Sequence, residues 1–454
     1  MLTVLAVAAP AAFVRTSGYH YRGGTMTSVR VGLLGCGNVG AALVELLDGH
    51  SVAIEKRTGL RLELARVAVA DPEKARPGAL DPSIVTDDAA SVVDDPSIEI
   101  VVELMGGIDP ARSLVLRALE SGKSVVSANK ELVAGHGLEL HAAAGAAGVE
   151  LLYEAAVGGG IPLLRPLRES LAGERITRVI GIVNGTTNYI LTKMTEDGAE
   201  YSDALAGAQE LGYAERDPTA DVDGFDAAAK GAILATIAFG QAVTTADVHR
   251  EGIRNITADD IIRARRLGFV VKLLVVAECD PDDRISVRAH PALVPATHPL
   301  ASVRDAFNAV FIEGEAVGEL MLYGRGAGGR PTASAVLGDL VDAAHGRSAT
   351  ARAPLAPPPA ARLIPIGELQ SAYYLNLDVA DRPGVLAQVA GVFGEHGVSI
   401  RSMEQHGMAA EAELTFHTHD IVEADMQATI EHLNRLDAVE SVGTLLRVVG
   451  DARL

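Results

Sequence analysis

Short apolar runs alternate with amphipathic segments in the first third of the chain. An apolar run begins at Val29, ends in a glycine-rich turn at 35–40 and is followed by an amphipathic stretch at 41–47. Further strand-like runs, with helical patterns between several of them, lie at 62–69, 98–104, 124–127 and 150–154. Strands that alternate with helices predict a doubly wound parallel sheet of the Rossmann type, in the α/β class.

The hydrophobic pattern changes after the three glycines at 158–160. A strand-like run at 176–183 and long alanine-rich helical runs between 202 and 239 predict a second, mixed α/β domain. A glycine-rich segment then leads into a predicted helix that we expect to return to the first domain. The predicted boundaries are 29–157 for the first domain, completed by about 322–346, and 158–321 for the second.

The last quarter of the chain has a third pattern. Residues 347–367 are rich in Ala and Pro, which predicts a semi-rigid linker. Beyond the linker, strand-like and helical stretches follow in the order βαββαβ. This order predicts an independent ferredoxin-like module over 368–454.

Composition and charge narrow the classes of function. The chain has 39 Lys and Arg against 59 Asp and Glu, a formal charge of −20, which argues against binding to nucleic acid or an anionic membrane. Two cysteines far apart, Cys36 and Cys279, argue against a disulfide framework and for a reducing, cytoplasmic compartment. We interpret residues 1–28 as a flexible leader, or as a start assigned ahead of Met26, with a signal peptide as the alternative.

The glycine-rich turn has the pattern G-x-G-x-x-G between a strand and a helix. Glycines there let the backbone approach a pyrophosphate held at the helix N-terminus, so the turn predicts dinucleotide binding, with a plain tight turn as the alternative. Asp71, at the end of the second strand, favours NAD, whereas the basic residues just beyond it favour NADP. The expected cofactor-binding residues of the turn are Gly35, Gly37, Asn38, Val39 and Gly40.

The segment V-V-E-L-M-G-G at 101–107, with S-A-N-K-E-L at 127–132, resembles the homoserine dehydrogenases. The resemblance runs from about Val29 to Val449 and implies NAD- or NADP-dependent interconversion of aspartate semialdehyde and homoserine, in threonine, methionine and isoleucine biosynthesis. It also implies a nucleotide-binding first domain, a catalytic and dimerising second domain, and a homodimer or homotetramer. Lys130 matches the lysine that contacts cofactor and substrate; a solvated surface lysine is the alternative.

Two glycine-rich segments carry further resemblances. The segment at 153–162 is similar to one whose main-chain carbonyls hold a monovalent cation, sodium or potassium, although its residues alone would equally describe a glycine hinge. The segment at 324–329 resembles a return loop near the cofactor, with Gly326 and Gly328 at its close approach. The implied cation ligands are Glu154, Val157, Gly159 and Ile161.

An acidic segment at 211–230 offers the groups that reduction of a carbonyl requires. Asp226 and Lys230 are four residues apart on a predicted helix, so they share a face and can pair. The resemblance makes Lys230 the proton donor, assisted by Lys130 and Asp226. It makes Glu215 and Asp226 homoserine ligands, with support from Asp221; a solvated charged face is the alternative.

The C-terminal module carries D-R-P-G-V-L-A at 381–387 and G-V-S-I-R-S at 397–402, which resemble the signature of ACT domains. This resemblance implies an amino-acid effector, threonine, or else dimerisation alone. One departure lies in the acidic segment, where Arg216 stands in place of a usual proline and loosens the backbone.

Two other functions compete with the reading as a homoserine dehydrogenase. A catalytically inactive sensor of amino acid and dinucleotide would have lost Lys230 or Glu215, and both are present. Another two-domain Rossmann enzyme, such as an aspartate semialdehyde dehydrogenase, requires a thiol nucleophile, and Cys279 has no histidine placed to activate it.

Overall fold

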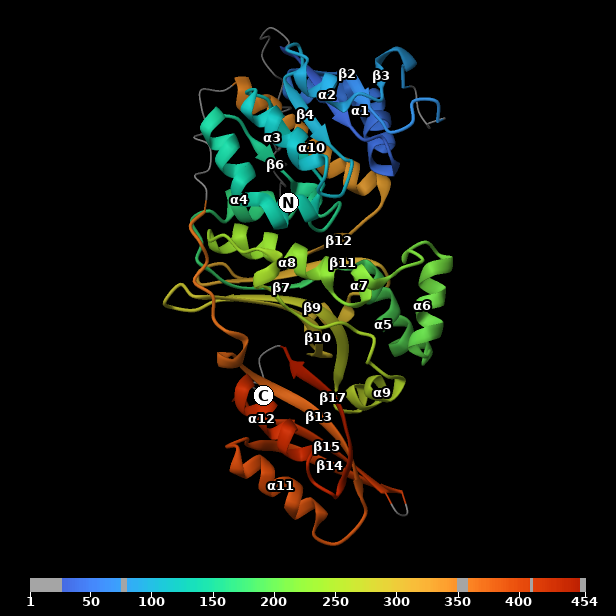
Figure 1. The fold of residues 1–454 in the computed structure, drawn as a ribbon, viewed down its shortest axis with the longest axis vertical. Coiled ribbons are helices and arrows are strands. Elements are labelled where there is room, and N and C mark those ends of the chain that lie inside the picture. Colours follow the sequence, from blue (N-terminus) through green and yellow to red (C-terminus); the bar gives the residue numbers. More distant parts are fainter. Residues whose placement is uncertain (1–26, 75–79, 349–357, 409–410, 450–454) are drawn as a thin grey trace, which may run out of the picture.

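The computed structural model describes residues 27–74, 80–348, 358–408 and 411–449. The predicted leader up to residue 26 and residues 349–357 of the predicted linker lie outside this description. Three layered parts follow one another along the long axis of the molecule (Figure 1). None of the helices in the described ranges is both long and apolar enough to cross a bilayer.

The first part is a six-stranded, all-parallel sheet in the order β3-β2-β1-β4-β5-β6. The strand order reverses between β1 and β4, which opens a crevice at the carboxyl ends of these strands. The predicted Rossmann-type sheet is therefore confirmed. Its strands are β1 (Thr27–Leu34), β2 (Leu60–Ala68), β3 (Val85–Thr86), β4 (Ile100–Glu103), β5 (Ser124–Ser127) and β6 (Leu151–Leu152).

Helices cover both faces of this sheet, which explains why its strands are continuously apolar. On β4, Ile100 and Val102 pack into the layer formed by α1 and α10, while Val101 packs into the layer that contains α3 and α4. Figure 1 shows α10 beside α1, so the chain returns to the first sheet after passing through the middle part. These helices are α1 (Asn38–Thr58), α2 (Ala89–Asp94), α3 (Ala111–Glu120), α4 (Lys130–Ala147) and α10 (Gly329–Ser348).

The middle part is a mixed sheet in which β12, β11, β7, β9 and β10 lie side by side. Helix α8 packs against β7, β9 and β10 on one side and against α4 on the other, so it lies between the first two parts (Figure 1). The strands are β7 (Ile176–Ile182), β8 (His249–Arg250), β9 (Phe269–Cys279), β10 (Ile285–Pro295), β11 (Phe307–Gly314) and β12 (Gly318–Arg325). The helices are α5 (Gly185–Asp197), α6 (Tyr201–Glu210), α7 (Thr219–Val222), α8 (Phe225–Phe239) and α9 (Ala258–Arg266).

The long helical runs predicted between 202 and 239 are three separate helices. Gly212, with φ of 73°, ends the first, and Gly224, with φ of 78°, precedes the last. Both glycines adopt the left-handed conformation that interrupts a right-handed helix. The interruption places an exposed loop, 211–217, ahead of α7 and α8.

The C-terminal part has the predicted βαββαβ order, and its sheet runs β17-β13-β15-β14 with antiparallel neighbours. Phe393, Phe416 and Leu377 lie in its own buried core. This confirms the ferredoxin-like architecture. The elements are β13 (Gln370–Ala380), α11 (Val385–Glu395), β14 (Ile400–Met408), β15 (Glu411–Thr418), β16 (Ile421–Val422), α12 (Glu423–Leu433) and β17 (Val439–Val448).

The C-terminal module is not independent of the rest, contrary to the expectation from the sequence. Strand β17 pairs in parallel with β10, with Arg447 opposite Ala292 and Val448 opposite Leu293. The two sheets thereby join into one of eleven strands. Pairing of two edge strands satisfies backbone groups that each edge would otherwise expose, and local patterns along the chain do not reveal it.

Candidate active site

The three glycines of the G-x-G-x-x-G turn are required for three different reasons. Gly35 has φ of 92°, and a Cβ there would lie 2.7 Å from the carbonyl oxygen of Leu104. A Cβ on Gly40 would lie 2.5 Å from the carbonyl oxygen of Gly35, so helix α1 packs directly against the turn. Gly37, which caps α1, faces open space. Its backbone is the part of the turn that a pyrophosphate can approach.

We expect Gly35→Ala to weaken dinucleotide binding at least tenfold and to destabilise the fold by about 1–3 kcal/mol. The added methyl group would meet the Leu104 carbonyl, in a backbone conformation that strains any residue with a side chain. Titration of reduced nicotinamide fluorescence and urea unfolding measure the two effects. Gly49→Ala in α1 is the matched control, since a Cβ there meets nothing within 4 Å. Equal affinities for both variants would contradict the expectation.

The return loop lies against the turn, as the resemblance implied. A Cβ on Gly329 would lie 2.9 Å from the carbonyl oxygen of Asn38, so α10 begins beside the start of α1. The carbonyl oxygen of Gly326 lies 2.4 Å from where a Cβ on Gly159 would be, so the loop also crosses the glycine turn at 158–160. Gly328 has φ of 122°. Three segments far apart in the sequence therefore meet beside the predicted dinucleotide turn.

Lys130 begins α4 at the carboxyl edge of β5, as expected of a residue that faces the crevice. The preceding residue, Asn129, fixes this start: its Oδ1 accepts a hydrogen bond from the Leu132 amide at 3.1 Å, which caps the helix. Its Nδ2 donates to the carbonyl oxygen of Gly107 at 2.6 Å. Capping and loop contact together set the position of the Lys130 backbone.

Glu103, at the end of β4, is a structural member of the site that the sequence analysis did not single out. Its side chain is fully buried. One carboxylate oxygen accepts from the Ser127 hydroxyl at 2.7 Å, and the other accepts from the Met105 amide at 2.8 Å. Glu103 thus ties the loop after β4 to the end of β5. A carboxylate inside an apolar strand is the signal that could have revealed it.

Asp226 is the centre of a charged cluster formed by both domains. Its side chain is 8% exposed, and its two oxygens contact the Nζ of Lys230 at 2.7 Å and the Nζ of Lys130 at 3.2 Å. The predicted pairing of Asp226 with Lys230 is therefore present. Burial opposes its ionisation, but the two ammonium groups hold the pKa of Asp226 at about 2. In return, although burial works against its charge, Asp226 raises the pKa of Lys130.

Asn184 connects a second carboxylate to the cluster. Its Oδ1 accepts from the Thr187 amide at 2.8 Å and caps α5, so its Nδ2 faces away from the helix. That Nδ2 donates to Asp226 at 2.8 Å and to Asp221 at 2.7 Å. Burial raises the pKa of Asp221. Asn184 therefore caps the helix with one side-chain atom and binds both carboxylates with the other.

Lys230 is held by two acceptors and keeps a third donor. Its Nζ donates to Asp226 and, at 2.7 Å, to the carbonyl oxygen of Val183. An ammonium group has three N–H bonds, so one remains for a ligand. The side chain is only 12% exposed, which limits competition from water. This geometry suits a group that transfers a proton to an oxygen atom in the crevice.

Glu215 is the predicted site residue that the structure does not bring into the cluster. Its side chain is exposed, and its main-chain carbonyl accepts from the Gln209 side chain at 3.0 Å. Among the described residues, no hydrogen bond or ion pair joins it to Asp226 or Lys230. Arg216 is exposed in the same loop. Lys130, Asp221 and Asp226 gather with Lys230, whereas Glu215 lies on the neighbouring surface loop.

The predicted cation segment surrounds a buried carboxylate. The side chain of Glu154 accepts from the amides of Leu164 at 2.8 Å and Arg165 at 2.7 Å, and also from that of Leu163. Val157 and Ile161 are buried, and Gly159 has φ of 54°. Within the described chain, no cluster of three or more His, Cys, Asp or Glu side chains is arranged to hold a metal ion.

Charged side chains gather around this segment. The Glu154 amide donates to Asp339 at 2.7 Å, and Arg165 pairs with Asp339 at 2.9 Å and Asp342 at 2.8 Å. Asp339 and Asp342 thus share the guanidinium of Arg165. Burial, strengthened by the charge of Glu154, raises the pKa of Asp339 to about 7 despite Arg165.

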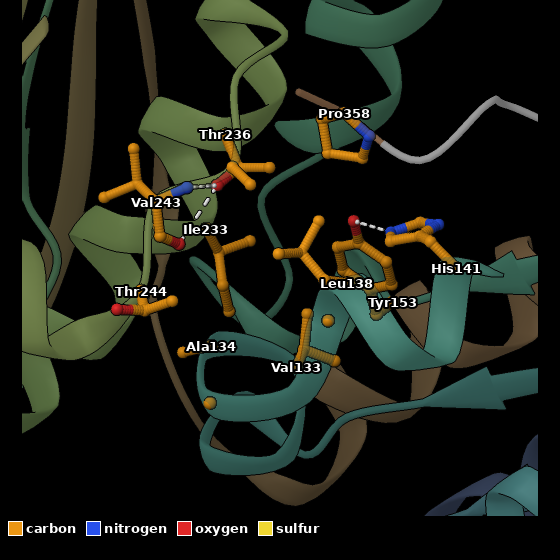
Figure 2. Close-up of a pocket in the computed structure, with 13 residues that line it drawn as sticks. Val133, Ala134, Leu138, His141, Tyr153, Ile233, Thr236, Val243, Thr244 and Pro358 are labelled. Atoms are coloured by element: carbon orange, nitrogen blue, oxygen red, sulfur yellow. Dashed lines mark hydrogen bonds between the residues drawn. The ribbon is translucent and has the colours of Figure 1, made fainter. Parts of the chain in front are cut away.

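A cavity of about 60 Å³ lies further along the groove between α4 and α8 (Figure 2). Val133 and Leu138 of α4 face Ile233 and Thr236 of α8 across it, and Tyr153 accepts or donates a hydrogen bond with His141 at its edge. No residue of its lining carries a carboxylate, ammonium or guanidinium group. The cavity could therefore hold only an apolar group. The candidate active site is the charged cluster, which lies one helical turn away along α4 and α8.

Comparison with known proteins supports the same assignment along the whole chain. The family model described as homoserine dehydrogenase matches residues 162–341, that of the homoserine dehydrogenase NAD-binding domain matches 35–154, and that of the ACT domain matches 373–438. The homoserine dehydrogenase of Corynebacterium glutamicum is 48% identical over 436 residues, which cover 94% of this chain and 97% of that protein.

Solved structures agree with the sequence comparison. A homoserine dehydrogenase from Thiobacillus denitrificans superposes with a TM-score of 0.89 at 41% identity, covering 93% of this chain and 99% of that one. A hyperthermophilic archaeal homoserine dehydrogenase in complex with NADPH has a TM-score of 0.60 at 29% identity, covering 70% of this chain and 98% of its own. The resemblance seen in the sequence is confirmed: the chain belongs to the homoserine dehydrogenases, NAD(P)-dependent oxidoreductases that here carry an ACT domain.

Proposed function

We propose that Lys130, Asp226 and Lys230 form the catalytic centre at which aspartate semialdehyde and homoserine are interconverted. The observation that carries the proposal is a single buried carboxylate, Asp226, that holds one ammonium group from each domain at the carboxyl edge of the nucleotide-binding sheet. A nicotinamide held beside this centre would supply or accept the hydride at the substrate carbon. The chain itself must then manage the charge and the proton of the oxygen.

Lys230 is the proposed proton donor. During reduction, the aldehyde oxygen gains negative charge and receives the proton from the Nζ of Lys230, whose third N–H is left for a ligand. The carboxylate of Asp226 and the carbonyl of Val183 fix that Nζ in place. Lys130, which belongs to the nucleotide-binding domain, stabilises the negative charge that develops on the same oxygen. No covalent intermediate is needed, and the proposed centre of Lys130, Asp226 and Lys230 includes no cysteine or serine nucleophile.

Acidic groups beside the centre are proposed to bind the substrate ammonium. Asp221, held by Asn184, lies next to Asp226. Glu215 is proposed as a further ligand that reaches the substrate from its exposed loop, on the strength of its matching family position. The glycine turn with Asn38 and Val39, and the return loop with Gly326 and Gly328, are proposed to bind NADP or NAD.

A spectrophotometric assay tests the proposed function directly. Purified chain should form reduced nicotinamide from homoserine and either NADP or NAD, and should consume it with aspartate semialdehyde. Turnover with one of the two cofactors is the expected result. Tight cofactor binding without homoserine-dependent turnover would contradict the proposal and favour a sensor of dinucleotide and amino acid.

A monovalent cation, sodium or potassium, is proposed to bind the main-chain carbonyls of Glu154, Val157, Gly159 and Ile161. The support is the pair of buried acidic side chains, Glu154 and Asp339, beside this segment, whose ionised forms a cation on neighbouring carbonyl oxygens would stabilise. Replacing potassium and sodium by tetramethylammonium at constant ionic strength should lower the unfolding temperature. An unchanged unfolding temperature in all three salts would reject a bound cation.

Threonine is proposed as the effector of the ACT domain. A hollow of about 360 Å³ lies at the turn between β13 and α11, lined by Asp381, Arg382, Gly384 and Gln405 among others. Gly384, with φ of 92°, caps α11, where backbone amides can receive the effector carboxylate. Asp381 is placed to receive its ammonium group.

We expect Asp381→Asn to raise the threonine concentration for half-inhibition by about tenfold, because a charge-assisted hydrogen bond to the effector becomes a neutral one. Turnover without threonine should stay near that of the wild type. Inhibition curves of both proteins at a fixed homoserine concentration provide the measurement. Identical curves, or inhibition of neither protein, would favour a domain that serves only assembly.

The assembly and location of the chain are also proposals. We propose a homodimer or homotetramer, and sedimentation that shows only monomers at micromolar concentration would reject it. A cytoplasmic location agrees with the thiols: Cys36 and Cys279 form no disulfide in the part of the chain that the structure describes.

A further inference from the structure

One buried guanidinium joins the C-terminal domain to the middle domain. The side chain of Arg447, on β17, is 3% exposed. Its Nη2 and Nε donate to Glu423 of the same domain at 2.7 and 2.8 Å. Its Nη1 donates to Glu251 of the middle domain at 2.8 Å. A carboxylate from each domain therefore shares Arg447.

The segment that contains Glu251 packs against the turn that precedes α8. The amide of Ile253 donates to the carbonyl oxygen of Val222 at 2.8 Å. The guanidinium of Arg250 donates to the carbonyl oxygen of Asp223 at 2.6 Å. A Cβ on Gly252 would lie 2.5 Å from the Val222 carbonyl oxygen, so the two backbones touch without intervening side chains. The turn at 222–224 is thus held by the segment at 250–253.

This turn separates the two carboxylates of the proposed substrate site. Asp221 precedes it, and Asp226 lies in the first turn of the helix that follows. Gly224 lies at the start of that helix, and a Cβ there would lie 3.0 Å from the carbonyl oxygen of Glu251. Glu251 consequently supports the start of α8 through its main chain, while its side chain binds Arg447.

The ion pair between Arg447 and Glu251 fixes the position of the 250–253 segment. Burial opposes the charge of Glu251, but a hydrogen bond from His249 at 2.7 Å and the charge of Arg447 hold its pKa at about 2. On the other side of Arg447, the Tyr373 hydroxyl donates to Glu423 at 2.5 Å. Charge-assisted bonds of this kind are shorter and stronger than neutral ones.

We propose that Arg447 and Glu251 are positioning residues for the homoserine site, so that the C-terminal domain forms part of the structure that places Asp221 and Asp226. The proposal rests on the proposed function of that site and adds to it how the site is held. It also connects the proposed effector site to the homoserine site, because β13 runs from Tyr373, beside Glu423, to the turn at Asp381. The dinucleotide turn lies in the other domain and has no part in this chain of contacts.

Glu251→Ala tests the proposal, because this side chain is a third exposed and its removal leaves no deeply buried void. The KM for homoserine should rise roughly tenfold, while the KM for the dinucleotide stays unchanged. Arg447→Lys should also raise the homoserine KM, because one ammonium group cannot serve both carboxylates as a guanidinium does. The rise should be smaller than in Glu251→Ala, since a lysine can still pair with one of the two carboxylates. The double variant should raise the homoserine KM by less than the product of the two single effects, because both substitutions break the same contact.

Glu413→Ala is the matched control. Glu413 on β15 pairs with Arg263 on α9, so it joins the same two domains away from the 222–224 turn. It should change neither KM. Equal effects of Glu413→Ala and Glu251→Ala, or equal rises in both KM values of Glu251→Ala, would overturn the proposal and leave only domain docking.

Hydrogen exchange provides a readout that does not depend on turnover. Amides at 222–226 should exchange faster in Glu251→Ala than in the wild type and in Glu413→Ala. If the wild type lacks homoserine turnover, the proposed function fails, yet this measurement still decides whether Glu251 holds the turn. Unchanged exchange at 222–226 would overturn the positioning role.

Discussion

Lys230→Met is expected to lower kcat by about three orders of magnitude, because the substitution removes the proton donor while keeping the length of the side chain. The Nζ of Lys230 lies at 2.7 Å from both Asp226 and the Val183 carbonyl, and a thioether can neither donate to them nor protonate an alkoxide. Dinucleotide affinity should stay near that of the wild type, because no contact of Lys230 involves the glycine turn. Steady-state kinetics and fluorescence titration measure the two quantities.

Lys193→Met is the matched control for this substitution. Lys193 also pairs with an aspartate four residues away, Asp197, at 3.0 Å, but on the surface of α5. Its loss should leave kcat unchanged, since surface ion pairs contribute little. A Lys230→Met enzyme that keeps more than about a tenth of the wild-type kcat would contradict the assignment of Lys230 as proton donor.

Asp226→Asn is expected to lower kcat/KM for homoserine by roughly two to three orders of magnitude. The neutral amide keeps the shape of the side chain but leaves two ammonium groups, of Lys130 and Lys230, close together without the carboxylate that pairs with both. Their repulsion should displace both from the reacting oxygen. Kinetics with homoserine as the varied substrate measure the loss, and Asp197→Asn, which breaks the surface pair, is the control. A loss confined to the dinucleotide KM would be inconsistent with this role.

The free energy of unfolding should depend on pH through the carboxylate of Asp226. The pKa of Asp226 is lowered from 3.8 to about 2, so its ionised form stabilises the folded state above pH 4. That contribution, about 2 kcal/mol, is lost as the pH falls from about 4 towards 2. Urea unfolding of wild type and Asp226→Asn should therefore give stabilities that converge in this range. A difference that does not vary with pH would show that the carboxylate is not paired as described.

The sequence predicts most of the fold because its local signals agree with each other. Apolar strands that alternate with helices, and the turn at Gly35 and Gly40, allow one sheet arrangement, which the structure confirms. The order of elements in the C-terminal module is likewise a local property. The pairing of Asp226 with Lys230 also followed from spacing, because four residues complete about one turn of a helix.

What the sequence could not predict depends on contacts between distant segments. The pairing of β10 with β17 joins two edge strands, and the sequence of neither strand indicates which strand it pairs with. The same holds for Lys130 with Asp226, which spacing cannot connect because they belong to different domains. Asn184 follows β7 and Glu103 ends β4, and only the structure shows which groups these two polar residues bind. Glu215 remains a prediction from the resemblance.

The parallel pairing of β17 with β10 has a consequence for the order in which the chain is made. Strand β17 follows every other strand, so the part of the β10 edge at Ala292 and Leu293 stays uncovered during synthesis until β17 itself has left the ribosome, whereas β8 already pairs with Arg288 and Ala289. An uncovered edge can pair with a strand of another nascent chain. The β10 edge of the middle sheet is therefore completed last, when Arg447 and Val448 of β17 pair with it. Newly made chains should be most prone to aggregate before β17 has been synthesised.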